Sequence, residues 1–156
     1  MKIAIIGKGR VATHLTQALA SAGHDIVMCG GRKRIQAVPA DAEVVIISIK
    51  DDAITKVASE FANSNALVLH TSGSVAIDAI PSQHRGVLYP MQTFSMERAV
   101  DFRNIPLFLE AASDEEMAKR KEKWQPREPK ITTGYLSRYR ELVTSGNRGA
   151  VLEVKK

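Results

Sequence analysis

The sequence predicts an α/β fold: a doubly wound, mainly parallel sheet followed by a short C-terminal extension. Three observations lead to this prediction. Strand-like apolar runs alternate with helix-like segments over roughly the first 110 residues. The first apolar run breaks directly into Gly-x-Gly-x-x-Ala at residues 7–12. Residues 117–156 are polar and basic and lack a sustained apolar period.

The elements can be assigned in chain order from periodicity and from turn residues. We expect strands over residues 2–6, 25–28, 43–49, 66–70, 87–91 and 106–110, and helices over about 11–22 and 53–62. The run 43–49 is apolar on both faces, as in a buried parallel strand. Gly23 is expected to cap the end of the first helix, and Asp52 the start of the second. Alternation of this kind implies right-handed crossovers and a parallel sheet.

The glycine motif after the first strand predicts a dinucleotide-binding turn. Gly7 permits the sharp turn at the strand end, and Gly9 lets the backbone approach a pyrophosphate. Ala12 is small enough for the helix to pack closely on the strand. The helix N-terminus offers N–H groups and a partial positive charge to the phosphates. We therefore expect the cofactor to contact Gly7, Lys8, Gly9, Arg10, Val11 and Ala12. An ordinary glycine turn between strand and helix is the alternative.

A basic cluster follows the second strand and bears on the choice of cofactor. An acidic residue at this place would bind the ribose 2′-hydroxyl of NAD, whereas basic residues suit the 2′-phosphate of NADP. The strand end carries no Asp or Glu, and Arg32, Lys33 and Arg34 come directly after it. We therefore expect NADP rather than NAD, with Arg32 and Lys33 among the contacts. A solvated basic loop is the alternative.

The ends of later strands add further candidate contacts, because ligands of open parallel sheets bind beyond the carboxyl ends of the strands. We expect contacts from Ser48, Ile49, Lys50, Thr71, Ser72 and Gly73. His70 could donate a proton beside a hydride acceptor or could be a hydrogen-bonded histidine at a strand end. Tyr89, Gln92 and Thr93 could contact substrate or the nicotinamide amide, or Tyr89 could be buried with its hydroxyl satisfied. The sequence identifies no catalytic residue.

Composition limits the classes of function. The net charge is +5, of which residues 1–113 carry +1 and residues 114–156 carry +4. Aromatic residues make up 5% of the chain and form no basic–aromatic face, so nucleic-acid binding is not expected. No apolar stretch has the length of a membrane span, and no Cys/His spacing suggests a metal site. The single cysteine, Cys29, and a first strand starting at residue 2 are typical of a cytoplasmic protein.

The order of the motifs resembles a known group of proteins. After the glycine motif come His70-Thr71-Ser72-Gly73 and Pro90-Met91-Gln92-Thr93-Phe94. Over about residues 2–117 the chain resembles the N-terminal Rossmann domain of NADP oxidoreductases related to pyrroline-5-carboxylate reductase and 6-phosphogluconate dehydrogenase. The resemblance is strongest to a little-characterised bacterial branch with these two motifs, although that branch usually has His where this chain has Tyr89.

The resemblance implies a function and a division of the chain. It implies a dinucleotide-binding domain over residues 1–116, a loop at Thr71–Gly73 that faces the nicotinamide, and hydride transfer to or from a small C=N or C=O substrate. Related proteins continue into a helical domain that forms a dimer and closes the substrate site. Residues 117–156 are too few and too polar to make it, so the chain is either a natural short form or, as we favour, truncated or altered at its C-terminal end. We expect these residues to be partly disordered in the monomer, or ordered only against another chain. An enzyme would then need a second subunit, as in a homodimer; the alternative is a non-catalytic NAD(P)-binding module.

Overall fold

A six-stranded sheet organises the chain in the computed structural model, which describes residues 1–102 and 105–111. The strands are β1 (Lys2–Ile6), β2 (Asp25–Gly30), β3 (Val44–Ile47), β4 (Leu67–His70), β5 (Arg85–Pro90) and β6 (Leu107–Ala111). Their order across the sheet is β2-β1-β3-β4-β5-β6, and β1 to β5 are parallel. The predicted α/β fold with a mainly parallel sheet is therefore confirmed. The expectations for residues 117–156 lie outside the described residues.

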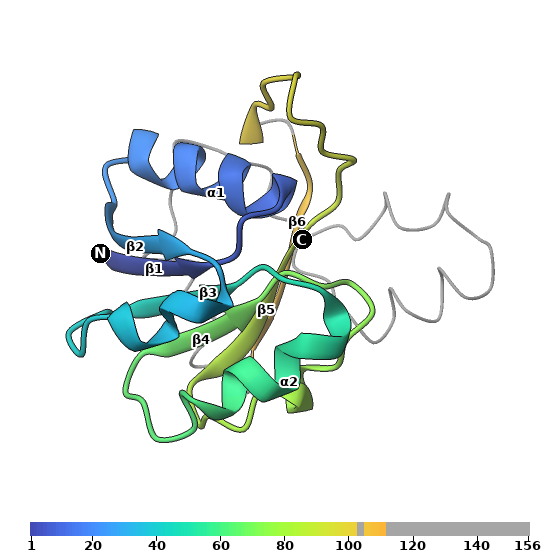
Figure 1. Cartoon of the computed structure of the whole chain (residues 1–156). Coiled ribbons are helices and arrows are strands. Elements are labelled where there is room, and N and C mark those ends of the chain that lie inside the picture. The colour runs from blue at the N-terminus through green and yellow to red at the C-terminus, as the bar shows by residue number, and fades with distance from the viewer. Residues whose placement is uncertain (103–104, 112–156) are drawn as a thin grey trace.

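Two helices, α1 (Arg10–Ser21) and α2 (Asp51–Ser59), cover opposite faces of the sheet (Figure 1). Alternate residues of β1 face the two layers, as the strand period of two requires. Ile3 and Ile5 pack in the cluster that contains Leu15 of α1, whereas Ile6 packs in the cluster that contains Ile54 of α2. β1 is therefore buried on both sides, which explains its continuous apolar sequence.

The helix boundaries follow local chemistry. Gly23 adopts φ +86°, and its N–H donates to the Ala20 carbonyl at 3.0 Å while the His24 N–H donates to Leu19 at 3.1 Å. This is a Schellman ending, so the predicted glycine cap of α1 is confirmed. The predicted Asp52 cap of α2 is wrong, because Lys50 is the N-cap residue and Asp52 lies within the first turn. An acid there stabilises the helix through its dipole rather than by capping.

Three connections differ from a regular doubly wound fold. Between β2 and β3 the chain forms a short 3₁₀ helix, η1 (Arg32–Ala37), and another, η2 (Ile77–Ala79), lies between β4 and β5. β6 pairs with β5 in the antiparallel sense, with Leu107 opposite Pro90. The described residues between β5 and β6 form no α-helix that could return the chain to the other edge of the sheet, so β6 runs back beside β5.

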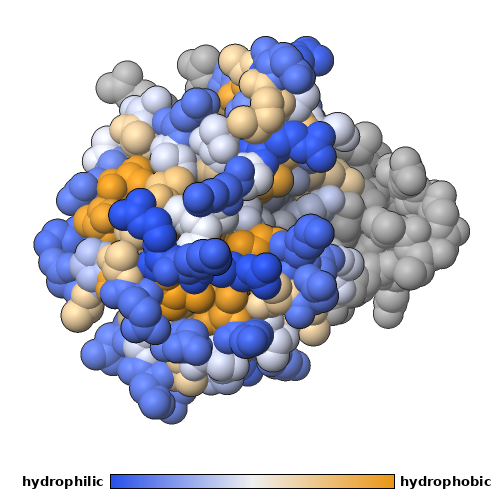
Figure 2. Space-filling model, in the orientation of Figure 1, coloured by the Kyte–Doolittle hydropathy of each residue, from blue (hydrophilic) through white to orange (hydrophobic). Residues whose placement is uncertain are grey.

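The strand order sets the position of the site. The chain leaves β1 for β2 on one side and then returns to β3 on the other side of β1. The carboxyl ends of β1 and β3 therefore form a topological switch point, the place where open α/β sheets bind ligands. On the face shown in Figure 2, hydrophilic residues surround smaller apolar patches.

Candidate functional site

All the cofactor contacts expected from the sequence lie at one edge of the sheet, beyond the carboxyl ends of four neighbouring strands. Residues 7–12 follow β1, Arg32 and Lys33 begin η1 after β2, residues 48–50 follow β3, and residues 71–73 follow β4. Residues up to 66 positions apart in sequence are thus brought to a common edge by the parallel sheet. To bind a dinucleotide, this edge must also offer open space for the phosphates and positive charge to attract them.

The turn at Gly7 is closed by tight packing. The Gly7 N–H donates to the Gly30 carbonyl at 2.7 Å, which ties the ends of β1 and β2 together. A Cβ at Gly7 would stand 2.2 Å from the Ser48 carbonyl oxygen and 3.0 Å from the Ala12 Cβ. Real Cβ atoms do not approach backbone so closely, so Gly7 and Ala12 together let α1 start directly against the end of β3.

Gly9 differs from Gly7 because it faces open space. It is exposed, and a Cβ placed on it would have no heavy atom within 4 Å among the described residues. Gly9 is the N-cap of α1, and its carbonyl accepts from the Thr13 N–H at 3.0 Å, the first hydrogen bond of the helix. The N–H groups of residues 10–12 precede that bond and therefore have no acceptor within the helix. This is the space and donor set that a phosphate group requires.

The first turns of α1 and α2 carry opposite charge. Asp51 and Asp52 occupy the first turn of α2, where their carboxylates complement the helix dipole. The first turn of α1 has no acidic residue, no side-chain cap and a basic residue, Arg10. Of the two α-helices in the described part of the chain, α1 is therefore the one that offers an uncompensated positive end to an anion.

Further basic side chains surround the ends of β1 and β2. The stem of Lys8 lies beside Gly31, where a Cβ would be 3.3 Å from the Lys8 Cε. The stem of Arg34 lies beside Gly30 in the same way, with 2.8 Å to its Cδ. Lys8, Arg32, Lys33 and Arg34 are exposed, and none forms an ion pair with a residue in the described ranges. Near β1 and β2, the carboxyl edge of the sheet is therefore positively charged, and these cations are available to a ligand.

The ends of β3 and β4 are joined by hydroxyl groups. The Thr71 hydroxyl donates to the Ser48 hydroxyl at 3.1 Å, and the Thr71 N–H donates to the Ile47 carbonyl at 3.2 Å. Beyond them the Ser74 hydroxyl donates to a carboxylate oxygen of Asp51 at 2.6 Å. These bonds hold the loop after β4 against the start of α2, so the loop has a defined shape at the crevice.

His70 has a structural role in this arrangement. It is fully buried, its Nδ1 accepts from the Ser72 N–H at 3.2 Å, and its Nε2 lies 3.3 Å from the Ala76 carbonyl oxygen. Because a carbonyl only accepts, Nε2 carries the proton. Both ring nitrogens therefore bond the loop 71–76. Of the two alternatives, the structure supports the hydrogen-bonded histidine at a strand end over the proton donor.

Tyr89 lies over the same loop and combines packing with a position at the crevice. A Cβ on Gly73 would be 2.9 Å from the Tyr89 Cζ, so the hydroxyl end of the ring lies directly on the glycine backbone. The ring also packs against Phe108, with centroids 6.3 Å apart, and the side chain is half-buried. A residue larger than glycine at position 73 would displace the ring.

One cluster, which is centred on His14, was not identified from the sequence. His14 is buried at 6% exposure, and its Nε2 lies 2.7 Å from the Ser95 carbonyl oxygen. Its ring lies 5.3 Å from that of Phe94, which stacks on Phe102 at 5.8 Å. No local signal could reveal a contact across 81 residues. An apolar helix face that includes His14 was the available hint.

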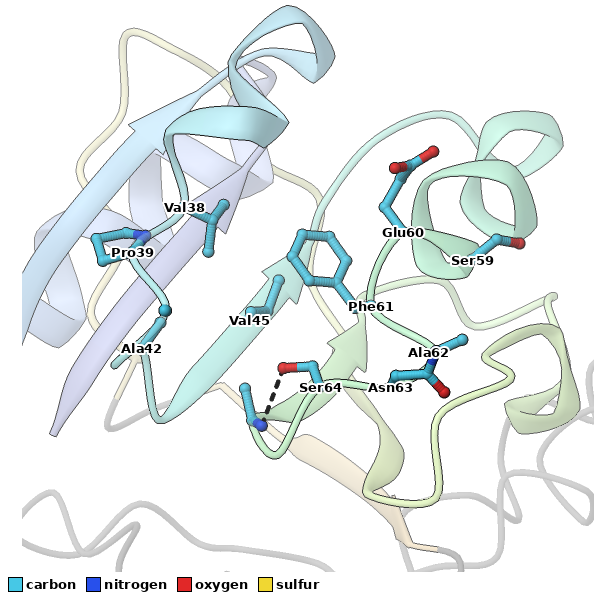
Figure 3. Close-up of a pocket in the computed structure, with 12 residues that line it drawn as sticks. Val38, Pro39, Ala42, Val45, Ser59, Glu60, Phe61, Ala62, Asn63 and Ser64 are labelled. Atoms are coloured by element: carbon cyan, nitrogen blue, oxygen red, sulfur yellow. Dashed lines mark hydrogen bonds between the residues drawn. The ribbon is translucent and has the colours of Figure 1, made fainter.

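A cavity of about 340 Å³ lies at the opposite edge of the sheet (Figure 3). Val45, at the start of β3, and Phe61, just after α2, form apolar walls, and Ser64 and Glu60 add polar groups. Its described lining contains no basic residue. The cavity does not match the charge of a dinucleotide, in contrast to the edge at Gly9.

Within residues 1–102 and 105–111, no three His, Cys, Asp or Glu side chains come together as metal ligands would. In the same part of the chain, no helix has the length and apolarity needed to span a membrane.

Comparison with solved structures identifies the fold. A protein described as an NADP oxidoreductase, from Bacteroides fragilis, superposes with a TM-score of 0.79 at 29% identity over 92% of this chain. Prephenate dehydrogenase from A. aeolicus, solved with hydroxyphenyl propionate and NAD⁺, superposes with a TM-score of 0.66 at 12% identity over 89%. This chain covers 64% and 61% of those two chains, respectively. No known family profile matches the chain.

Sequence comparison with curated proteins gives a different and shorter match. A stretch of 55 residues is 64% identical to dihydroxy-acid dehydratase from Lachnospira eligens, which is 35% of this chain and 10% of that enzyme. A stretch of this length cannot include both β1 and β6, so it does not describe the sheet. The sheet is that of the nucleotide-binding module of dehydrogenases and reductases, as the solved structures show.

Proposed function

We propose that the domain binds NADP across the carboxyl edge of its sheet and belongs to an oxidoreductase that transfers hydride to or from a small C=N or C=O substrate. The observation that carries the proposal is the contrast between two glycines of one turn. Gly7 has no room for a Cβ, whereas Gly9 faces open space at an uncompensated helix N-terminus. Packing explains Gly7, whereas the open space at Gly9 would admit a ligand that approaches the backbone.

The pyrophosphate would lie on the turn 7–12. The N–H groups of residues 10–12 would donate to its oxygens, and Arg10 and Lys8 would add charge. The absence of an acid from this turn, in contrast to α2, favours an anion here.

The 2′-phosphate would lie at η1. Arg32 and Lys33 are exposed at its start, and no acidic residue ends β2, where NAD-specific proteins place one. The similar B. fragilis structure is described as an NADP oxidoreductase, while the A. aeolicus enzyme was solved with NAD⁺. The basic η1 therefore supports the choice of NADP.

The nicotinamide half would extend along the edge towards β4 and β5. Ser48 and Thr71 would line its ribose, and the loop at residues 71–73, with Tyr89 packed on Gly73, would face the ring. When bound, the cofactor supplies the hydride chemistry. The residues of this chain would hold and orient it. From the motifs at residues 70–73 and 90–94 we also propose that the chain is related to the little-characterised bacterial branch.

The alternative is a nucleotide-binding module without turnover. The chain spans 64% of the B. fragilis protein's length, and the described residues form one sheet domain with no second domain to cover the crevice. An enzyme would need such a cover, because hydride transfer needs an enclosed substrate.

Titration of the full chain with NADPH and NADH, by calorimetry and by nicotinamide fluorescence, tests the proposal. We expect NADPH to bind at least about tenfold more tightly, which corresponds to about 1.4 kcal/mol. Binding of neither cofactor would contradict the cofactor site. Equal binding of both would retain the site and contradict the 2′-phosphate assignment.

A further inference from the structure

The segment that follows β5, residues 91–95, is held at both ends. At its start the Met91 N–H donates to the Pro106 carbonyl at 2.9 Å. At its end the Ser95 carbonyl accepts from the His14 ring at 2.7 Å. Between these points Phe94 is buried at 5% exposure against the His14 and Phe102 rings. The segment therefore has little freedom to move relative to α1 and β6.

His14 connects this segment to the helix that begins at the phosphate turn. It lies four residues after Arg10, the first residue of α1, and so one turn into the helix. The Ser95 oxygen only accepts, so Nε2 carries the proton and donates. Figure 1 shows the connection between β5 and β6 passing beside the first turns of α1. A side chain of the cofactor helix thus sets the position of a segment 81 residues away.

Two polar side chains project from the held segment. Gln92 and Thr93 are exposed, although the residue that follows them is buried. Their amide and hydroxyl groups can both donate and accept hydrogen bonds, as the carboxamide of nicotinamide does. The held segment therefore presents two hydrogen-bonding side chains at its exposed surface.

The strand order indicates which half of a dinucleotide would meet them. η1 follows β2 at one end of the sheet, and the segment follows β5, on the other side of β1 and separated from it by β3 and β4. A dinucleotide with its 2′-phosphate at η1 and its pyrophosphate at Gly9 extends away from η1. Its nicotinamide end is therefore the part that reaches β4 and β5.

We propose that His14 is a positioning residue that holds Gln92 and Thr93 against the nicotinamide end of the cofactor. This inference rests on the proposed NADP site, and it adds a site for the carboxamide and a residue that acts through Ser95 rather than by contact. If His14 only stabilised the domain, replacing it would weaken the binding of both halves of the cofactor equally.

The affinities for two ligands distinguish a positioning role of His14 from a merely structural one. NADPH contains both halves of the dinucleotide, whereas adenosine 2′,5′-bisphosphate contains only the half expected at η1. We would measure the affinity of the full chain for each by calorimetry, and the emission of bound NADPH by fluorescence. The variants are His14→Leu, which keeps the volume and removes the donor, and His14→Gln, whose amide N–H can still donate to Ser95.

We expect His14→Leu to weaken the binding of one of the two ligands and not of the other. His14→Leu should weaken NADPH about tenfold and alter its bound emission, while the affinity for the bisphosphate stays within about twofold. His14→Gln should recover most of the loss. Equal weakening of both ligands, or unchanged NADPH affinity in a folded His14→Leu, would overturn the inference. If neither ligand binds the unaltered chain, the NADP site itself fails, which is a distinct outcome.

A second variant covers the case in which His14→Leu does not fold. Gln92 and Thr93 are exposed, so replacing both by alanine removes the proposed contacts and leaves the core unchanged. We expect the same selective loss of NADPH affinity in this double variant. Wild-type affinity for NADPH would overturn the inference, whatever the behaviour of His14→Leu.

Discussion

The Gly7 backbone lies so close to the Ser48 carbonyl oxygen that a β-carbon on Gly7 would stand 2.2 Å from it. Two residues 41 positions apart thus meet at the carboxyl ends of β1 and β3. The neighbouring glycine of the motif has no such contact. The two glycines should therefore respond to substitution in different ways.

The first prediction compares Gly7→Ala with Gly9→Val. Gly7→Ala should lower the free energy of unfolding by about 1–3 kcal/mol, because the added carbon overlaps backbone that can move only with β3. Gly9→Val should leave the fold largely intact and abolish dinucleotide binding, because its side chain occupies the space of the pyrophosphate. Urea unfolding followed by circular dichroism measures the first effect, and calorimetry with NADPH the second. Normal NADPH binding by folded Gly9→Val would show that the cofactor does not lie on this turn.

The second prediction concerns the preference for NADPH. Arg32→Ala should remove much of it, because a charge-assisted hydrogen bond to phosphate contributes roughly 1.5–3 kcal/mol. The affinity for NADH should change little. Lys56→Ala is the matched control, because Lys56 is an exposed cation on α2, away from this edge. Parallel titrations of both cofactors at low and moderate salt provide the measurement. An unchanged NADPH-to-NADH ratio in Arg32→Ala contradicts the assignment.

The third prediction concerns pH and His24. Partial burial, and then the positive N-terminus, lower the pKa of His24 below its ordinary value of 6.5, with Glu43 acting in the opposite direction. The unfolded chain therefore takes up this proton at a higher pH than the folded chain. The contribution of His24 to stability is complete above about pH 6.5 and decreases as pH falls below it.

His24→Gln removes this titration, so its free energy of unfolding should fall less than that of the wild type between pH 7.5 and 5.5. Urea denaturation at both pH values measures the difference. The same pH dependence in the variant and the wild type would show that His24 does not contribute to it.

The fourth prediction concerns residues 117–156. Every proposed cofactor contact lies between Gly7 and Thr93, so a chain ending at Glu116 should bind NADPH like the full chain. We also expect the full chain alone to reduce small imines and ketones slowly or not at all, because hydride transfer requires a substrate held close to the nicotinamide. Absorbance at the NADPH band gives the rate. Rapid oxidation of NADPH that is lost on truncation would show that residues 117–156 complete an active site and would rule out the module.

Local pattern alone determined much of this protein. The bounds of β1, the glycine end of α1 and the alternation of strands with helices follow from side-chain period and turn chemistry, which act between near neighbours. The gathering of residues 7–12, 32–33, 48–50 and 71–73 at one edge could also be predicted, because parallel strands place their carboxyl ends together.

Tertiary structure decided the remaining features, because these features depend on contacts between residues far apart in the sequence. The reversed direction of β6 is set by its pairing with β5, and the burial of His70 by the loop folded over it. The His14 ring is fixed by a carbonyl 81 residues away, and no periodicity in the sequence encodes that partner. Side-chain type and spacing report which face of an element is apolar. Which distant backbone atom that face meets is determined only when the sheet and its connections are packed together.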